Sequence, residues 1–209
     1  MSVITFPAAL AVMKSSWAQH RNDIQYRSPF GAQVVEGSGP LWAATLQAPL
    51  AADSISGAWK AYLMQLRGKT NQAALWDFGR PAPRGTMRGT MTLNAEAVQG
   101  ATTLSIIASG ENAKTLVQGD LLGLGSGITQ QVVMVTADAT SNGSGVISVT
   151  VEPPLRNTHA IAAAVTWDKP CALFRRASSA AKWDYAPSGI AGDFIVSNFS
   201  LDLIEDWRA

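Results

Sequence analysis

The chain has few of the residues that carry out most enzyme chemistry. Its 209 residues include one cysteine and two histidines, and only 15% of them are charged. A single cysteine, Cys171, excludes an intrachain disulfide, and its apolar neighbours favour a buried structural thiol. Neither His20 nor His159 has a second histidine or cysteine at the spacing of a metal site. We therefore predict a protein that is not an enzyme, with no catalytic residue, cofactor or metal.

Long apolar runs are also missing. No stretch approaches the ~20 residues that cross a bilayer, and the N-terminal segment lacks the basic residues that open a signal peptide. The net charge of +1 gives no strong attraction to nucleic acid or acidic lipid. Low charge beside 47% hydrophobic residues indicates surface buried against partners, because interface cores lose charged residues. A compact monomer rich in alanine and glycine is the alternative.

Three partial matches to catalytic or phosphate-binding motifs fail on their details. The glycine-rich run from Gly123 to Gly127 is not a nucleophile elbow and is typical of a turn at a strand end. Gly68-Lys69-Thr70 lacks the earlier glycine of a phosphate-binding loop and follows a helix instead of preceding one. Asp202, Glu205 and Asp206 are better interpreted as solvated or interface charges than as an acid–base set.

One convincing helix is predicted, beginning near Asp53 and ending at Gly68. Asp53 is suited to the N-cap, and Gly68 to the left-handed position that closes a helix. The apolar residues between them recur at helical spacing on one face. They are Ile55, Ala58, Trp59, Tyr62, Leu63 and Leu66. A single amphipathic helix in a strand-rich chain is expected to pack on a sheet.

The rest of the chain is typical of strands separated by turn residues. Residues 1–31 suggest an irregular arm or an early strand. Strands are predicted outside the middle of the chain at 33–36, 41–48, 73–78 and 194–204. Six shorter runs in the middle, at 91–94, 103–108, 120–125, 129–136, 145–151 and 160–167, favour a small barrel or sandwich. The run from Ser141 to Gly145 is the best candidate for a hairpin turn, because its Asn-Gly pair readily takes positive φ angles.

Aromatic residues almost vanish between Thr90 and Trp167 and then return. Residues 90–169 contain three basic and six acidic residues, although the whole chain is slightly positive. We therefore predict a discontinuous first domain, residues 1–87 and 170–209, interrupted by an inserted barrel at 88–169. The helix face would form the host core with Trp42, Trp76, Phe174, Trp183 and Phe194. A single extended sandwich is the alternative.

Basic residues gather around the end of the helix and beyond it. They are Arg67, Lys69, Arg80, Arg84 and Arg88, with Asp77 the one acid among them. Such a cluster beside aromatic residues can bind nucleic acid. A flexible positive loop that pairs with a neighbouring subunit fits the near-neutral chain better, since arginine suits interface ion pairs.

An ordered set of motifs resembles the distal tail protein of long-tailed, siphovirus-type bacteriophages. The set comprises W-x-A-x4-P-L at 42–50, Leu66-Arg67-Gly68, the run LWDFGRPAPRGTMRG at 75–89, Gly119-Asp120, and Pro153 to Arg156. The resemblance covers most of residues 30–205. It implies a mainly β fold, with a β-sandwich belt domain, one flanking helix and an inserted small barrel.

The same resemblance implies a structural virion protein. Six copies would form a ring in the tail tip or baseplate, between the tail tube protein and the hub or tip proteins, and would hold peripheral tip proteins. The protein would be made in the host cytoplasm. The residues expected at subunit contacts are Arg67, Lys69, Arg80, Arg84, Arg88, Trp207 and Arg208. A carbohydrate- or receptor-binding tail module and another minor tail structural protein are the alternatives.

Overall fold

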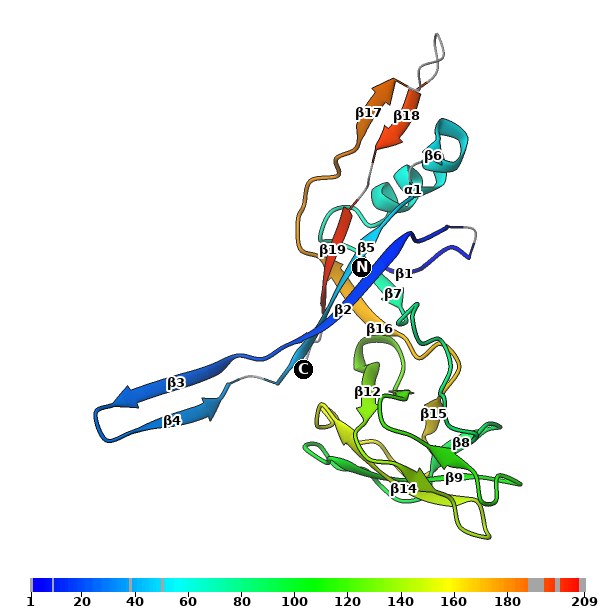
Figure 1. Ribbon diagram of the computed structural model, residues 1–209. Helices are drawn as coiled ribbons and strands as arrows, with labels where there is room; N and C mark the ends of the chain where they lie inside the picture. Colours follow the sequence, from blue (N-terminus) through cyan, green and yellow to red (C-terminus); the bar gives the residue numbers. More distant parts are fainter. Residues whose placement is uncertain are drawn as a thin grey trace. The chain divides into compact units, whose positions relative to one another are not determined.

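A computed structural model describes residues 2–8, 10–37, 39–49, 51–187, 194–197 and 200–206. Over these residues the chain is mainly β, with one α-helix and a closed six-stranded barrel, which confirms the predicted fold class (Figure 1). The chain divides into two compact units. The first unit comprises Met1–Gln19, Trp42–Leu75 and Leu173–Asp206; the second comprises His20–Leu41 and Trp76–Ala172, together with 207–209, which lie outside the described residues. The predicted boundaries at 88 and 169 stay a prediction.

The first unit is built on a six-stranded sheet in the order β1-β7-β16-β19-β5-β2. Its strands are β1 (Val3–Thr5), β2 (Lys14–His20), β5 (Leu41–Gln47), β7 (Gln72–Leu75), β16 (Ala172–Arg176) and β19 (Ser200–Glu205). β1 runs parallel to β7, whereas β19 runs antiparallel to both β16 and β5. Alternate residues of β5 and β19 are buried, which is the period-2 pattern of a strand with one covered face.

The helix α1 (Asp53–Gln65) supplies much of the core of this unit. Four residues of its predicted apolar face, Trp59, Tyr62, Leu63 and Leu66, are at most 3% exposed. The rings of Trp59 and Tyr62 both meet Phe6 edge-on, at centroid distances of 5.8 and 5.4 Å. Burial of the helix on this aromatic cluster, rather than its intrinsic propensity, stabilises it.

The structure tests the predicted C-terminal end of the helix but not the predicted N-cap. The helix ends at Gln65, before the predicted Gly68, and Arg67 and Gly68 after it are both left-handed, with φ of +47° and +62°. The helix begins at Asp53 itself, and the side chain of Asp53 lies outside what the structure describes, so its capping role stays a prediction. With 13 residues, this helix of the described chain is too short to cross a membrane.

The second unit contains the closed barrel, whose strand order is β11-β12-β14-β9-β8-β15. All six runs predicted in the middle of the sequence are barrel strands: β8 (Met91–Leu93), β9 (Thr103–Ala108), β11 (Leu121–Leu124), β12 (Gln131–Val135), β14 (Val146–Glu152) and β15 (Ala164–Thr166). Inside the barrel, Leu104 lies opposite Val149, and Ile106 lies opposite Ile147. All four are at most 1% exposed, so facing strands fill the interior with aliphatic side chains.

Small elements complete both units. A three-stranded sheet of β17 (Asp184–Pro187), β18 (Phe194–Ser197) and β6 (Ala51–Ala52) belongs to the first unit. The second unit adds the pair β10 (Thr115–Leu116) and β13 (Ala139–Thr140), the 3-10 turn η1 (Gly127–Thr129), and the hairpin of β3 (Asp23–Ser28) and β4 (Gly31–Glu36).

Several local predictions need correction. Of the two alternatives for residues 1–31, the early strand is borne out over the described residues, which hold β1, β2 and β3, and the irregular arm is not. The strand expected at 73–78 ends at Leu75, and Trp76 belongs to the second unit instead of the host core. The left-handed residue of the predicted hairpin turn is Gly145, with φ of +76°, and not Asn142 or Gly143. The Oδ1 atom of Asn142 instead accepts backbone N–H groups of Ser144 and Val146.

The predicted host core is otherwise partly confirmed. Trp42 and Phe174 are buried in the first unit with the helix face. Trp183 is only half-buried, and the side chain of Phe194 lies outside what the structure describes. The strand expected from 194 to 204 appears as β18 and β19, with residues 198 and 199 outside the described chain.

Substitution of Trp59 by alanine should lower the free energy of unfolding by about 3–5 kcal/mol, because it leaves a large cavity beside Phe6 and Tyr62. Met64→Ala is the matched control, since Met64 is on the same helix but 60% exposed. That change should stay within about 0.5 kcal/mol of wild type. Chemical denaturation followed by circular dichroism measures both, and equal stabilities would contradict this core.

Candidate interaction surface

The structure does not bring the predicted basic residues together in one loop. Arg67 and Lys69 are exposed beyond the end of α1 in the first unit. Arg80, Arg84 and Arg88 lie in the second unit, in the segment 76–90, which we call the connecting segment. Strand β7 separates the two groups along the chain. Trp207 and Arg208, the other predicted contact residues, lie outside the described residues.

The connecting segment is fixed by a buried carboxylate rather than flexible. Asp120 is fully buried and accepts three backbone N–H groups: from Arg84 at 2.7 Å, from Gly85 at 3.1 Å and from Val117 at 2.8 Å. Gly119 beside it has a φ of +82°, which turns the chain so that Asp120 can face these donors. The Gly119-Asp120 pair in the motif set therefore ties the connecting segment to the barrel.

The arginines of the connecting segment donate to carbonyl oxygens within their own unit. The Arg88 guanidinium donates to Gly85 at 2.8 Å and to Pro83 at 2.9 Å, and it lies 5.0 Å from the centre of the Trp167 ring. Arg84 donates through Nη2 to the Gln118 carbonyl at 2.7 Å. These contacts use some of the N–H groups of Arg84 and Arg88 within the second unit, and the role of both residues at subunit contacts stays a prediction.

Sequence analysis predicted one strand of an exposed feature of the second unit, at 33–36, but not the hairpin of β3 and β4 that it belongs to, which we call the arm. Its two strands pair only with each other among the described residues, and every residue from 23 to 36 is exposed (Figure 1). An isolated two-stranded hairpin is marginally stable in water. A signal for it was present, because Pro29 and Gly31 interrupt two runs with strand-like residues.

The two faces of the arm differ in polarity. Ile24 lies opposite Val35, and Tyr26 lies opposite Gln33, so these side chains share one face. Ile24, Tyr26 and Val35 are 53%, 60% and 43% exposed, and Phe30 at the tip is 99% exposed. This row is an apolar surface that no described residue covers, and such surfaces mark interaction sites.

The opposite face of the arm is more polar. Gln25 lies opposite Val34, and Arg27 lies opposite Ala32. The Arg27 Nε donates to the Gln25 side chain at 3.0 Å. The apolar face is therefore a property of one side of the hairpin, which gives it a direction in which a partner would bind.

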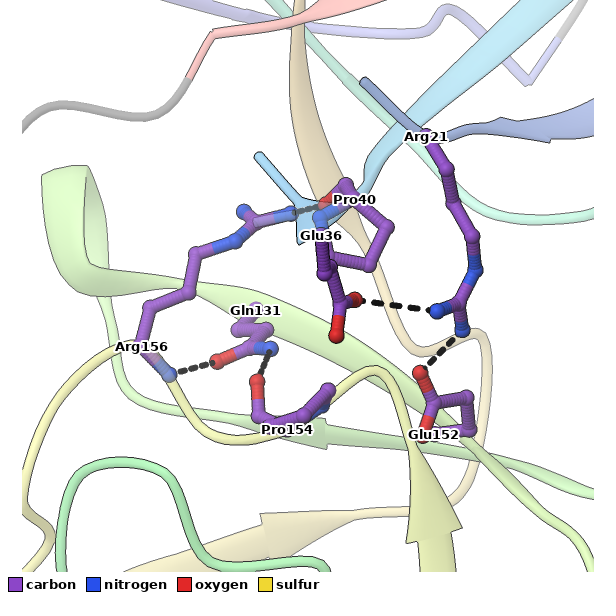
Figure 2. A network of polar contacts seen from close by, with 7 residues as sticks. All are labelled: Arg21, Glu36, Pro40, Gln131, Glu152, Pro154 and Arg156. Carbon is purple, nitrogen blue, oxygen red and sulfur yellow. Dashed lines mark hydrogen bonds and ion pairs between the residues drawn. The ribbon is translucent and has the colours of Figure 1, made fainter. Parts of the chain in front are cut away.

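The root of the arm is held by an arginine between two carboxylates. Arg21 donates to Glu36 at 3.0 Å and also forms an ion pair with Glu152 at the end of β14 (Figure 2). Partly exposed pairs of this kind each contribute about 1 kcal/mol or less. Their shared arginine nevertheless links both strands of the root to a barrel strand.

A second, buried arginine reinforces the same root. Arg156 is 7% exposed and donates through Nη2 to the Pro40 carbonyl at 2.7 Å (Figure 2). Its backbone N–H donates to the Gln131 side chain at 2.9 Å, whose own amide donates to the Pro154 carbonyl at 2.9 Å. The Pro153–Arg156 motif thus joins β12, the end of β14 and the segment after β4.

The two histidines and the cysteine differ in their surroundings. His20 is exposed, whereas His159 is buried and its pKa is lowered by desolvation. Burial raises the pKa of the half-buried Cys171 thiol, with Lys169 opposing that shift. No three histidine, cysteine or carboxylate side chains of the described residues lie close enough to hold a metal ion.

The three C-terminal carboxylates are not all solvated, contrary to expectation. Glu205 is buried and accepts the Trp42 backbone N–H at 2.9 Å. Asp206 pairs with Arg175 inside the first unit. Only Asp202 is exposed, and it accepts the hydroxyl of Thr45 at 2.9 Å. Glu205 and Asp206 therefore serve the sheet instead of a partner.

Comparison with known proteins gives no family assignment: no protein-family model matches the chain, and no curated protein is significantly similar to it.

Asp120→Ala should lower the free energy of unfolding by about 3 kcal/mol, because three backbone N–H groups, one of them fully buried, lose a shared acceptor. Asp138→Ala provides a control, since the exposed Asp138 accepts a single N–H, from Gln118. Its loss should not exceed about 1 kcal/mol. Urea unfolding of the full chain measures both, and a mild Asp120→Ala variant would contradict the role of this carboxylate.

Stability should fall as the pH drops below about 6.5, because the neutral His159 takes up its proton more readily in the unfolded chain. The loss continues down to the lower pKa of the folded state and then levels off. The buried Nε2 has no hydrogen-bond partner among the described residues, so a proton there is unfavourable. His159→Gln should flatten this slope between pH 7 and 5, while His20→Gln should leave it as in wild type; thermal unfolding across that range is the measurement.

Proposed function

We propose that this chain is a structural protein of a phage tail tip that assembles with copies of itself into a closed ring. The ring, with six copies expected, would join the tail tube to the tip or baseplate and anchor peripheral tip proteins. The observation that carries the proposal is the arm, a hairpin exposed along its length with one apolar face. The ordered motifs shared with distal tail proteins supply the identity of the assembly.

The physical case for self-association starts from the cost of an exposed apolar hairpin. Ile24, Tyr26, Phe30 and Val35 offer contact area that becomes favourable only when a partner excludes water. Identical copies related by rotation can each supply an arm and receive one, which closes a ring without leaving an unmatched surface. The fixed root at Arg21 supports this, because a directed arm loses less freedom on binding.

The same arm favours a second candidate, a carbohydrate- or receptor-binding tail module. A shallow hollow of about 310 Å³ at its tip is lined by Tyr26, Phe30 and their neighbours from Arg27 to Gln33. Exposed aromatic rings suit contacts to the apolar faces of sugars. The two candidates differ in what the arm would bind: another copy of the chain or a ligand on the host.

Tyr26→Ser combined with Phe30→Ser should abolish oligomers and leave a folded monomer, because exposed residues contribute little to the fold itself. Gln25→Ser with Arg27→Ser, on the opposite face, is the matched control and should assemble as wild type does. Mass photometry and negative-stain imaging of concentrated protein would count the subunits.

Oligomers that persist in the Tyr26→Ser and Phe30→Ser variant would show that the arm is not the contact. A wild-type chain that remains monomeric at all concentrations, both alone and when mixed with tail tubes, would contradict the ring. Binding of a soluble glycan that is lost with the same two substitutions would favour the receptor-binding alternative.

A further inference from the structure

Arg176 is an internal cation whose hydrogen bonds are incomplete. It is the last residue of β16 in the first unit and is 7% exposed. Its Nη2 donates to the Ala180 carbonyl, whereas Nε and Nη1 are buried and have no hydrogen-bond partner among the residues that the structure describes. Desolvation lowers its pKa. A buried charge is stable only when it is paired or fully hydrogen-bonded, so this guanidinium lacks two of its acceptors.

A cavity of about 280 Å³ adjoins Arg176 within the same unit. Helix α1 contributes Leu63, the segment after β16 contributes Ser178, Ala180 and Lys182, and the start of β19 contributes Ser200 and Asp202. Hydroxyl groups supply further donors around it, and the exposed Lys182 ammonium, which pairs with Asp184 at 3.4 Å, adds a positive charge. The volume is several times the ~30 Å³ that one water occupies, so a tetrahedral ion with its remaining water fits.

We propose that this cavity binds a small oxyanion, a phosphate or carboxylate group, on the guanidinium of Arg176, with Lys182 at its entrance. The planar fork of arginine matches two oxygens of one such group. Turning the end of the side chain presents Nε and Nη1 to the cavity that Arg176 already lines. The inference goes beyond the ring proposed above and does not depend on it.

Asp202 offers the simplest competing account. This carboxylate also lines the cavity and could turn toward Arg176, but it accepts the hydroxyl of Thr45 at 2.9 Å. If Asp202 neutralises Arg176 in solution, the protein needs no added anion. An oxyanion site requires instead that stability rise with phosphate and saturate.

The test uses the full chain with inorganic phosphate, at constant ionic strength maintained with chloride. Thermal unfolding and ³¹P line broadening should both show saturable binding to wild type. Arg176→Met should weaken it at least tenfold. In chloride alone this variant should be no less stable than wild type, because an apolar side chain replaces a buried, underbonded charge.

Arg175→Gln is the matched control. Arg175 is the neighbouring residue of β16, faces the other side of the sheet and pairs with Asp206. Its loss should lower stability but leave phosphate affinity as in wild type. If Arg176→Met does not fold, Arg176→Lys replaces it and should bind phosphate several-fold more weakly, since it keeps the charge without the fork.

Three results would overturn the site. One is a wild-type response to phosphate and acetate that never saturates. Another is saturable binding that survives unchanged in both Arg176 variants. The third is a phosphate-insensitive chain whose self-association is lost in Arg176→Met, because the acceptor would then be a carboxylate of a second copy.

Discussion

The second unit depends on one buried carboxylate. Asp120 gathers three backbone N–H groups, two of them from the chain that enters the barrel and one from its own turn. Hydrogen bonds to an ionised acceptor are stronger than those between neutral groups. Removing the carboxylate would leave all three N–H groups without this acceptor. Arg88 and its contacts with Pro83 and Gly85 can form only once this segment is in place. Polar contacts thus fix the connecting segment against the barrel, whose interior is aliphatic.

Much of the fold could be predicted because it follows from local periodicity. The helix face from Trp59 to Leu66 and the six barrel runs each bury residues at the spacing of their element. The aromatic-poor middle also marked the barrel, whose interior is filled by aliphatic pairs such as Leu104 and Val149. Both signals depend only on residues close together in the sequence, so they can be recognised without knowing which distant residues are in contact.

The candidate surface was harder to predict because it depends on distant partners. Arg88 looked free to bind a neighbour, but its acceptors are carbonyls that only the folded segment presents. Glu205 and Asp206 looked solvated, yet their partners lie 163 residues away at Trp42 and 31 residues away at Arg175. The strand predicted at 33–36 lies in β4, but its pairing with β3 was missed because the two strands bury neither face, and burial of one face is the usual signal of a paired strand.

The pairing of β1 with β7, which is parallel, and of β19 with both β16 and β5, which is antiparallel, has a consequence for synthesis on the ribosome. All six barrel strands lie between residues 91 and 166, so each has its neighbours before β16 is made. The six-stranded sheet cannot be completed until residues 200–205 emerge, since β19 lies between β16 and β5. Domains generally fold as units during translation, and distant pairings form late. The barrel is therefore expected to fold first. The strands β1, β2 and β5 are synthesised earlier, but their sheet is complete only after β19 has been made.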